Sequence, residues 1–168
     1  IELDELIFNK KNLKLKKYLP SFIKKLKLEE HKININYNQN KFDIKGNGNI
    51  LLEDKLDKIS YQVIKDEKNI LFDSKINLNS NSLIIDFLDY EKEENLNSLI
   101  SVKGSYKKNN QLTFSLISLK ENNNKILIKG LELNKDFKII NIENFDINYR
   151  NNKKILNKIK LKKHNSNF

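Results

Sequence analysis

Few residues of this sequence have the types and spacing that catalysis or metal binding needs. The two histidines, His31 and His164, stand far apart without partners at metal-ligand spacing, so we expect both to be solvated and predict no metal site. The glycines Gly46 and Gly48 lie inside a strand pattern and not at a strand-to-helix turn, which argues against a phosphate-binding loop. There is no cysteine, and no serine belongs to a motif that supplies a general base. We therefore expect no enzymatic reaction and no cofactor.

One group of carboxylates is dense enough to consider as a binding site. Its members are Asp86, Asp89, Glu91, Glu93 and Glu94. Such a cluster could hold a cation weakly or pair with the basic ends of the chain. A solvated acidic loop is the simpler interpretation.

Positive charge is concentrated near the two ends of the chain. The net charge is +10, yet residues 10–27 hold eight lysines and no acid, and residues 150–163 hold seven Lys or Arg and no acid. The sequence between them is close to neutral. Three interpretations remain open: the lysine-rich composition of an AT-rich genome, contact of the basic ends with an anionic membrane surface or acidic partner, and nucleic-acid binding, which we consider unlikely.

The composition suits a sheet with one apolar face. Hydrophobic residues make up 38% of the 168 residues and charged residues 32%, too few apolar side chains for a thick two-layer core. No apolar run approaches the roughly 20 residues that a membrane-spanning helix needs. Because the sequence begins at Ile1 and not at Met, we expect a segment of a longer protein.

The clearest structural pattern covers residues 98–133. Ile100 and Val102 alternate with Ser101 and Lys103, and two further alternating runs follow after short polar turns, which predicts a β-meander. The alternation slips by one residue after Leu116 and again at Gly130, where we expect bulges that bend the sheet.

The rest of the chain continues this pattern in both directions. We expect strands over residues 1–8, 13–15, 31–37, 42–52, 59–63, 70–78 and 83–88, a polar stretch over 90–97, one bulged strand or two short ones over 137–149, and a basic edge strand over 155–161. About ten antiparallel strands make a sheet that must curl, close or stack. Gly46 and Gly48 favour a kink, or close approach of another chain or ligand. Helical spacing after Pro20 predicts a short helix over 21–28, which either covers one end of the sheet or lies on a membrane or partner.

Three segments carry a resemblance to a known family. They are NGNILLEDKLDKISYQV (47–63), INLNSNSLIIDFLDYEKEENLNSLISVKGSY (76–106) and NNNKILIKGLELNKDFKIINIENFDINY (122–149). In pattern and order this sequence resembles the AsmA-like proteins of Gram-negative bacterial envelopes, most nearly the YhdP type. The match is best over residues 41–161 and includes no catalytic motif.

Taken together, the strand pattern, the helix expected after Pro20 and the open groove that the resemblance implies predict a mainly β protein: a long curved antiparallel meander sheet forming an open groove, with one short helix near the N-terminus. Residues 1–168 would form one groove segment, with an end element over 1–30, the sheet over 31–163 and a frayed tail over 164–168. The resemblance further implies that the groove carries phospholipid acyl chains between the inner and outer membranes. The segment would act in the periplasm, beside neighbouring repeats of the same inner-membrane-anchored chain.

On this interpretation the groove is lined by the apolar residues of one strand face. The candidates are Phe42, Ile44, Ile50, Leu52, Tyr61, Ile70, Phe72, Ile76, Ile100, Val102, Leu112, Phe114, Ile126, Ile128, Ile147 and Tyr149. The alternative is that these residues form the closed core of a structural or assembly domain that binds no ligand.

Overall fold

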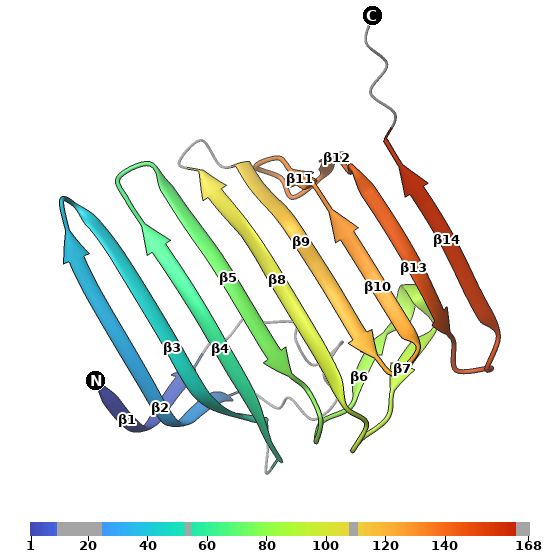
Figure 1. The fold of residues 1–168 in the computed structure, drawn as a ribbon, viewed down its shortest axis with the longest axis horizontal. Coiled ribbons are helices and arrows are strands. Elements are labelled where there is room, and N and C mark those ends of the chain that lie inside the picture. The colour runs from blue at the N-terminus through green and yellow to red at the C-terminus, as the bar shows by residue number, and fades with distance from the viewer. Residues whose placement is uncertain (10–24, 53–54, 108–110, 164–168) are drawn as a thin grey trace, which may run out of the picture.

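A computed structural model describes residues 1–9, 25–52, 55–107 and 111–163 of the chain, and these are mainly β (Figure 1). Within them, twelve strands form one antiparallel sheet. Ten strands follow one another across it in the order β1 (Glu2–Asn9), β2 (Lys25–Asn38), β3 (Lys41–Leu52), β4 (Lys55–Lys65), β5 (Asn69–Asn77), β8 (Ser98–Lys107), β9 (Gln111–Glu121), β10 (Asn124–Lys129), β13 (Asn144–Arg150) and β14 (Leu156–Lys162). The predicted mainly β class and long antiparallel sheet are confirmed.

Shorter elements leave this path at two places. β11 (Leu131–Leu133) pairs with both β9 and β12 (Ile139–Asn141). A separate hairpin is made of β6 (Leu83–Ile85) and β7 (Tyr90–Lys92), joined by the 3-10 turn η2 (Asp86–Leu88). The strand expected over 83–88 therefore ends as a 3-10 turn. The polar stretch over 90–97 contains the strand β7. The run over 137–149 forms two strands, β12 and β13 (Asn144–Arg150).

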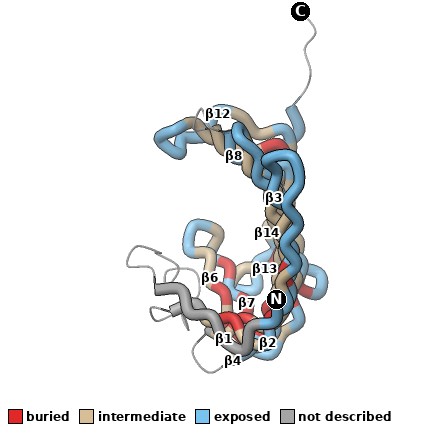
Figure 2. Tube along the Cα trace, turned by 90° about the vertical axis from the view of Figure 1, so that its left-hand side faces the viewer, coloured by how far each residue is buried: buried red, intermediate tan, exposed pale blue. Residues whose placement is uncertain are grey.

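The sheet is curved and its ends do not meet. Figure 2 shows that it bends into an open arc, with β6 and β7 inside the arc near its lower end. β1 and β14 are the two outer strands, so the lysine-rich run at 155–161 forms an edge as predicted. We call the inside of the arc the concave face and the outside the convex face.

Two irregularities lie where the alternation slips. Lys103 pairs with Leu116 whereas Gly104 pairs with Phe114, which leaves Ser115 as an extra residue in β9. Gly130, at a φ of +61° that favours glycine, separates β10 from β11. The bulge predicted after Leu116 is confirmed at Ser115, whereas the strand is interrupted at Gly130 and the nearest register shift lies between Glu132 and Leu133, where β11 pairs with β12. Because β9 pairs with β10 along one part and with β11 along another, the sheet bends at this point.

Strand pairing places the apolar residues of successive strands in rows on the concave face. One such row contains Ile59, Ile76, Ile100, Leu119, Ile126 and Ile147. The neighbouring positions along each strand, such as Lys58, Lys75 and Ser101, face the other way because side chains alternate. The sheet therefore has one apolar face and one mainly polar face.

The predicted helix over residues 21–28 is wrong for the part that the structure describes. Residues 25–28 belong to β2, where Leu28 pairs with Leu6 on one side and Ile50 on the other. Pairing with two neighbouring strands prevails over local helical spacing, since it satisfies the backbone on both sides. The expected boundary between residues 30 and 31 falls inside β2. Residues 21–24, the short strand expected over 13–15 and the tail over 164–168 lie outside the described residues.

The buried core lies where the segment of residues 78–97 packs on the lower part of the concave face. From this segment come Leu78, Leu83 and Tyr90. From the sheet come Leu28, Ile50, Leu119, Ile126, Ile147 and Tyr149. The segment thus supplies a second layer over one end of the sheet.

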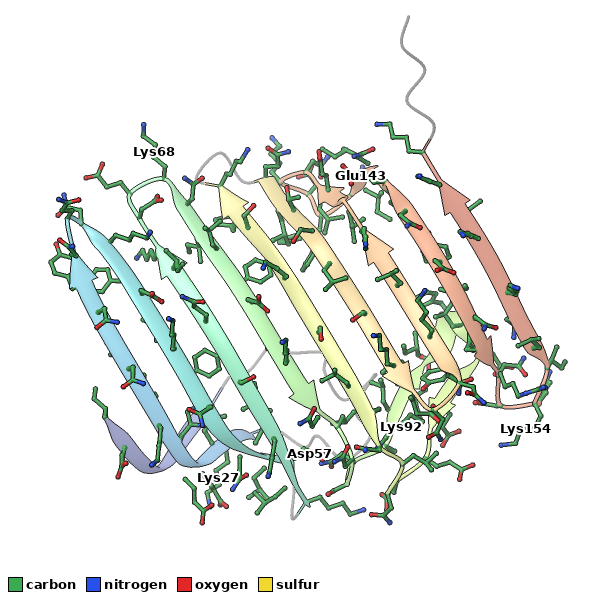
Figure 3. The ribbon with its side chains drawn as sticks, in the orientation of Figure 1. Lys27, Asp57, Lys68, Lys92, Glu143 and Lys154 are labelled. Atoms are coloured by element: carbon green, nitrogen blue, oxygen red, sulfur yellow. The ribbon has the colours of Figure 1, made fainter. Side chains whose placement is uncertain are left out.

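A buried carboxylate holds the start of this segment against the sheet. Oδ1 of Asp57 accepts hydrogen bonds from the backbone N–H groups of Asn79 (2.7 Å) and Ser80 (2.8 Å). Oδ2 accepts from the side-chain amide of Asn81 at 2.8 Å. Nζ of Lys92, on β7, donates to the backbone oxygens of Asn79 (2.8 Å) and Asn81 (2.5 Å). Figure 3 labels Asp57 and Lys92 at this lower end.

Burial and the neighbouring charges have opposite effects on the pKa of Lys92. Its side chain is fully buried. Loss of solvation lowers the pKa of its ammonium group, and the negative charges of Asp57, Glu121 and Glu94 partly counteract this effect. Lys92 therefore needs its carboxylate neighbours in order to stay charged inside the fold.

Two tyrosines attach the end of the hairpin. The hydroxyl of Tyr90 donates to Oε2 of Glu121 at 2.5 Å, and that of Tyr149 donates to the backbone oxygen of Leu88 at 2.6 Å. The two rings meet edge to face with centroids 5.6 Å apart. Burial, followed by the hydrogen bond and charge of Glu121, raises the pKa of Tyr90, so its hydroxyl remains a donor.

We predict that Asp57→Ala lowers the free energy of unfolding by about 3 kcal/mol or more, because buried N–H groups and the Lys92 ammonium lose their acceptor and counter-charge. The control is Asp43→Ala, since Asp43 makes its bond to Gln62 on the convex face and should cost less than about 1 kcal/mol. Urea unfolding measures both. Equal losses for the two variants would contradict this role of Asp57.

Candidate functional site

The predicted groove residues share one face of the sheet. Strand pairing connects them across β3 to β13: Ile44 lies opposite Val63, Val63 opposite Phe72, and Phe72 opposite Gly104. The same pairing places all of the other candidates whose side chains are described on the concave face. Leu52 ends β3, and its side chain is outside the described part of the chain.

The candidates divide into two groups according to what covers them. Those beneath residues 78–97 are Ile50, Ile126, Ile147 and Tyr149, which are buried, and Ile76 and Ile100, which are partly buried against them. These six residues are core, as the closed-core alternative expects. The structure therefore separates them from the rest of the predicted lining.

The second group remains half exposed. We call it the upper concave face, and it comprises Phe42, Ile44, Tyr61, Ile70, Phe72, Val102, Leu112, Phe114 and Ile128, together with Val63, Ile117 and Leu131, which the prediction omitted. Ile117 follows the bulge at Ser115 and Leu131 follows Gly130, so simple alternation does not reveal their side of the sheet. The slips located in the sequence after Leu116 and at Gly130 put both residues on the apolar side, although neither was included among the lining candidates.

Aromatic rings on this face lie over glycines of the neighbouring strands. A Cβ at Gly46 would overlap the Tyr61 ring, and a Cβ at Gly104 would overlap the backbone oxygen of Thr113 and contact the Phe72 ring. Phe72 in turn meets Phe114 edge to face, with centroids 5.8 Å apart. The close approach expected at the strand glycines is thus made by side chains of this sheet itself.

His31 departs from the sequence-based expectation. It was expected to be solvated, but it is only 1% exposed and stacks on Tyr61 with ring centroids 5.6 Å apart. It lies at an irregularity of β2, beside Glu30 at a φ of +47°, and its ring approaches Gly48. Neither ring nitrogen has a hydrogen-bond partner. Burial lowers the pKa of His31, because the charged imidazolium would lose its solvation.

We predict that His31 makes the protein less stable in mild acid. Since its pKa is lower in the folded than in the unfolded state, the unfolded chain takes up the proton first as the pH falls below the ordinary value of 6.5. Stability should decline from there until the folded-state pKa is passed. The urea concentration at the unfolding midpoint should therefore decrease between pH 7.5 and 5 by more in the wild type than in His31→Phe. The measurements are made at several pH values on both sides of 6.5. Tyr61→Phe, which keeps the ring stack, serves as the control and should follow the wild type. An unchanged slope in His31→Phe would refute the prediction.

Two carboxylates of the acidic cluster face lysines. Glu94 pairs with Lys55 at 2.5 Å, and Glu93 approaches Lys154 at 3.9 Å. Among the described residues, no three potential ligands from His, Cys, Asp or Glu come together. The expected pairing of this cluster with the basic end at 150–163 is therefore observed between Glu93 and Lys154.

The depression beside this cluster is also polar. It measures about 480 Å³ and is lined by residues that include Glu91, Glu121, Asn124 and Arg150. Its mixed charges and amides give no single ligand class an advantage, so it is a weaker candidate than the apolar upper concave face.

Searches for related proteins do not assign this chain to a family. Comparison with protein-family models, curated proteins and solved structures finds no match to this chain. Within the described residues, none of the helical turns has the length and apolarity to span a membrane.

Proposed function

We propose that the upper concave face binds acyl chains of phospholipids and that the segment takes part in lipid transfer without catalysing a reaction. The observation that carries the proposal is a largely apolar face that stays partly exposed, whereas the lower part of the same face is covered by residues 78–97. Exposed apolar faces of this extent are typical of interaction or ligand sites.

The dimensions agree with this ligand class. The path from β3 through β4, β5, β8 and β9 to β10 crosses five strand intervals, or about 24 Å. One leaflet of a bilayer has a hydrocarbon thickness of about 15 Å, so an acyl chain could lie across the strands on this face. Each buried methylene would contribute about 0.8 kcal/mol. Such contacts select for apolar chains and are indifferent to the headgroup.

The resemblance to AsmA-like proteins supports the same function. On that basis we propose a periplasmic location in a Gram-negative envelope, as part of a longer chain with neighbouring repeats. The curved, open antiparallel sheet agrees with the architecture that the resemblance implies.

We expect phospholipid to co-purify with the wild-type chain, and Phe72→Asp to lower the bound lipid at least about tenfold, because a carboxylate against acyl chains is costly. Leu71→Asp is the matched control: Leu71 is the next residue of β5, 46% exposed, and points to the convex face. Native mass spectrometry and lipid extraction measure the bound lipid, and circular dichroism checks the fold. Val102→Thr, a nearly isosteric change, tests the same face with less strain and should weaken binding more mildly.

The alternative is a structural or assembly domain that binds no lipid. The buried core beneath residues 78–97 favours it, because that part of the sheet covers its own apolar surface. A wild-type chain that is free of lipid, takes up no fluorescent phospholipid and unfolds cooperatively would support this alternative and exclude the transfer function. Equal losses of lipid in Phe72→Asp and Leu71→Asp would also count against the concave face as the site.

A further inference from the structure

Exposed aromatic side chains gather at one end of the strands. In the described part of the chain five aromatic residues are exposed. Four of them lie at the upper ends of strands or in the turns there: Tyr37, Phe42, Tyr106 and Phe137. The fifth, Phe87, lies in η2 at the lower end. Four of five at one end is an uneven distribution that the fold itself does not require.

These side chains form a line along the upper ends of the strands. Tyr37 pairs with Phe42 across the β2–β3 hairpin, and their ring centroids are 4.6 Å apart. Tyr106 lies further along the sheet, near the upper end of β8, where it pairs with Ile70. Phe137 lies between β11 and β12, at 72% exposure. Next to it, Ile139 and Ile140 are also exposed.

Lysines accompany these apolar side chains. We define the upper rim as residues 37–42, 64–70, 106–107, 133–143 and 162–163, which lie at this end of the sheet (Figures 1 and 3). The rim contains eight lysines: Lys41, Lys65, Lys68, Lys107, Lys135, Lys138, Lys162 and Lys163. It contains four acids: Asp66, Glu67, Asp136 and Glu143. All eight lysines are exposed.

Two of the rim acids are already engaged, Asp66 within its own turn and Glu67 by the neighbouring β2–β3 turn. Oδ1 of Asp66 accepts the backbone N–H groups of Lys68 (2.8 Å) and Asn69 (2.7 Å). Oε1 of Glu67 accepts the side-chain amide of Asn40 at 3.3 Å. The rim is therefore net positive, with lysines interspersed among exposed aromatic and aliphatic side chains.

The β6–β7 hairpin at the lower end has the opposite character. The hairpin segment there carries the five carboxylates from Asp86 to Glu94 against one lysine, the buried Lys92. The basic turn between β13 and β14 adjoins this acidic hairpin, with Lys154 3.9 Å from Glu93. The positive charge of this turn is thus partly countered by the hairpin, whereas the residues that define the upper rim carry twice as many lysines as acids.

We propose that the upper rim is a docking surface for an anionic lipid bilayer. Aromatic side chains are favoured at the depth of lipid headgroups, and lysines near the surface interact favourably with anionic lipids. The rim combines both along one line of strand ends. The sheet would then stand on the bilayer by these ends, with the upper concave face nearest the lipid. Docking of this kind does not require that the concave face bind acyl chains, so it goes beyond the function proposed above.

The experiment is flotation of the purified chain with vesicles. One set of vesicles is pure phosphatidylcholine, and in the other about a quarter of the lipid is phosphatidylglycerol. We expect the wild type to float with the anionic vesicles, to bind the neutral ones far less, and to be released when salt rises from ~0.1 to ~0.5 M. Lys135→Glu combined with Lys138→Glu should lower the partition coefficient at least about tenfold. Phe137→Ser combined with Ile140→Ser should lower it to a similar extent through lost apolar insertion.

Matched variants at the lower end serve as controls. Lys153→Glu combined with Lys154→Glu changes the same charge in the basic turn between β13 and β14, and Phe87→Ser removes the exposed aromatic residue of η2. Both should bind vesicles like the wild type. All of these side chains lie on open surface, and the charge of Lys154 is partly countered by Glu93. The midpoint temperature of thermal unfolding should therefore change little in any variant.

The outcomes separate this proposal from the acyl-binding function. If the rim variants lose vesicle binding while keeping co-purified lipid, and Phe72→Asp does the reverse, both proposals hold independently. Absence of vesicle binding by the wild type, equal binding to neutral and anionic vesicles, or equal losses in the lower-end controls would each overturn rim docking. Salt-sensitive capture of a protein or nucleic acid in place of vesicles would overturn it in favour of that partner class.

Discussion

The hydrogen bonds of the Asp57 carboxylate are the interaction on which the arrangement of the concave face depends. One buried side chain accepts backbone N–H groups at the start of the segment 78–97, and Lys92 returns from the far strand of the hairpin to donate to the same loop. The charges of Asp57 and Lys92 favour each other where neither is solvated. This polar network fixes the position of a hairpin whose apolar side chains then complete the core.

The hairpin divides a single apolar face into two regions with different physical roles. Beneath it, residues such as Ile126 and Ile147 are buried and contribute to stability as any core residue does. Above it, Phe72 and Val102 belong to the same strand pattern but stay half exposed. An antiparallel sheet commonly has one solvated face, but that face is usually polar. Here the half-exposed region is apolar, and its upper margin carries the aromatic and lysine side chains of the rim. Binding of acyl chains and docking on a bilayer are two uses of apolar surface that would fit together in one protein.

Sequence reasoning succeeded where a local pattern sufficed. Alternation identified the meander, its slips located the bulge at Ser115 and the strand interruption at Gly130, and lysine-rich alternation identified the edge strand β14. It failed where distant pairing prevails over local preference. Residues 25–28 have helical spacing but are strand, because β1 pairs with all four and β3 also pairs with Lys27 and Leu28. His31 is polar and was expected in solvent, yet an irregularity of β2 places its ring against Gly48 and Tyr61.

The sequence by itself determined which face of the sheet each residue occupies. Period-2 alternation assigns Phe72 to the apolar face and Leu71 to the other without any knowledge of the fold, because consecutive side chains of a strand must point in opposite directions. Only the tertiary structure decided which apolar residues are core and which remain exposed. That distinction depends on where residues 78–97 return to the sheet, and their position is set by Asp57, Lys92 and Glu121, which meet only in the folded chain. Polar residues so far apart have no local signature, since their bonds form only once the intervening strands have brought them together.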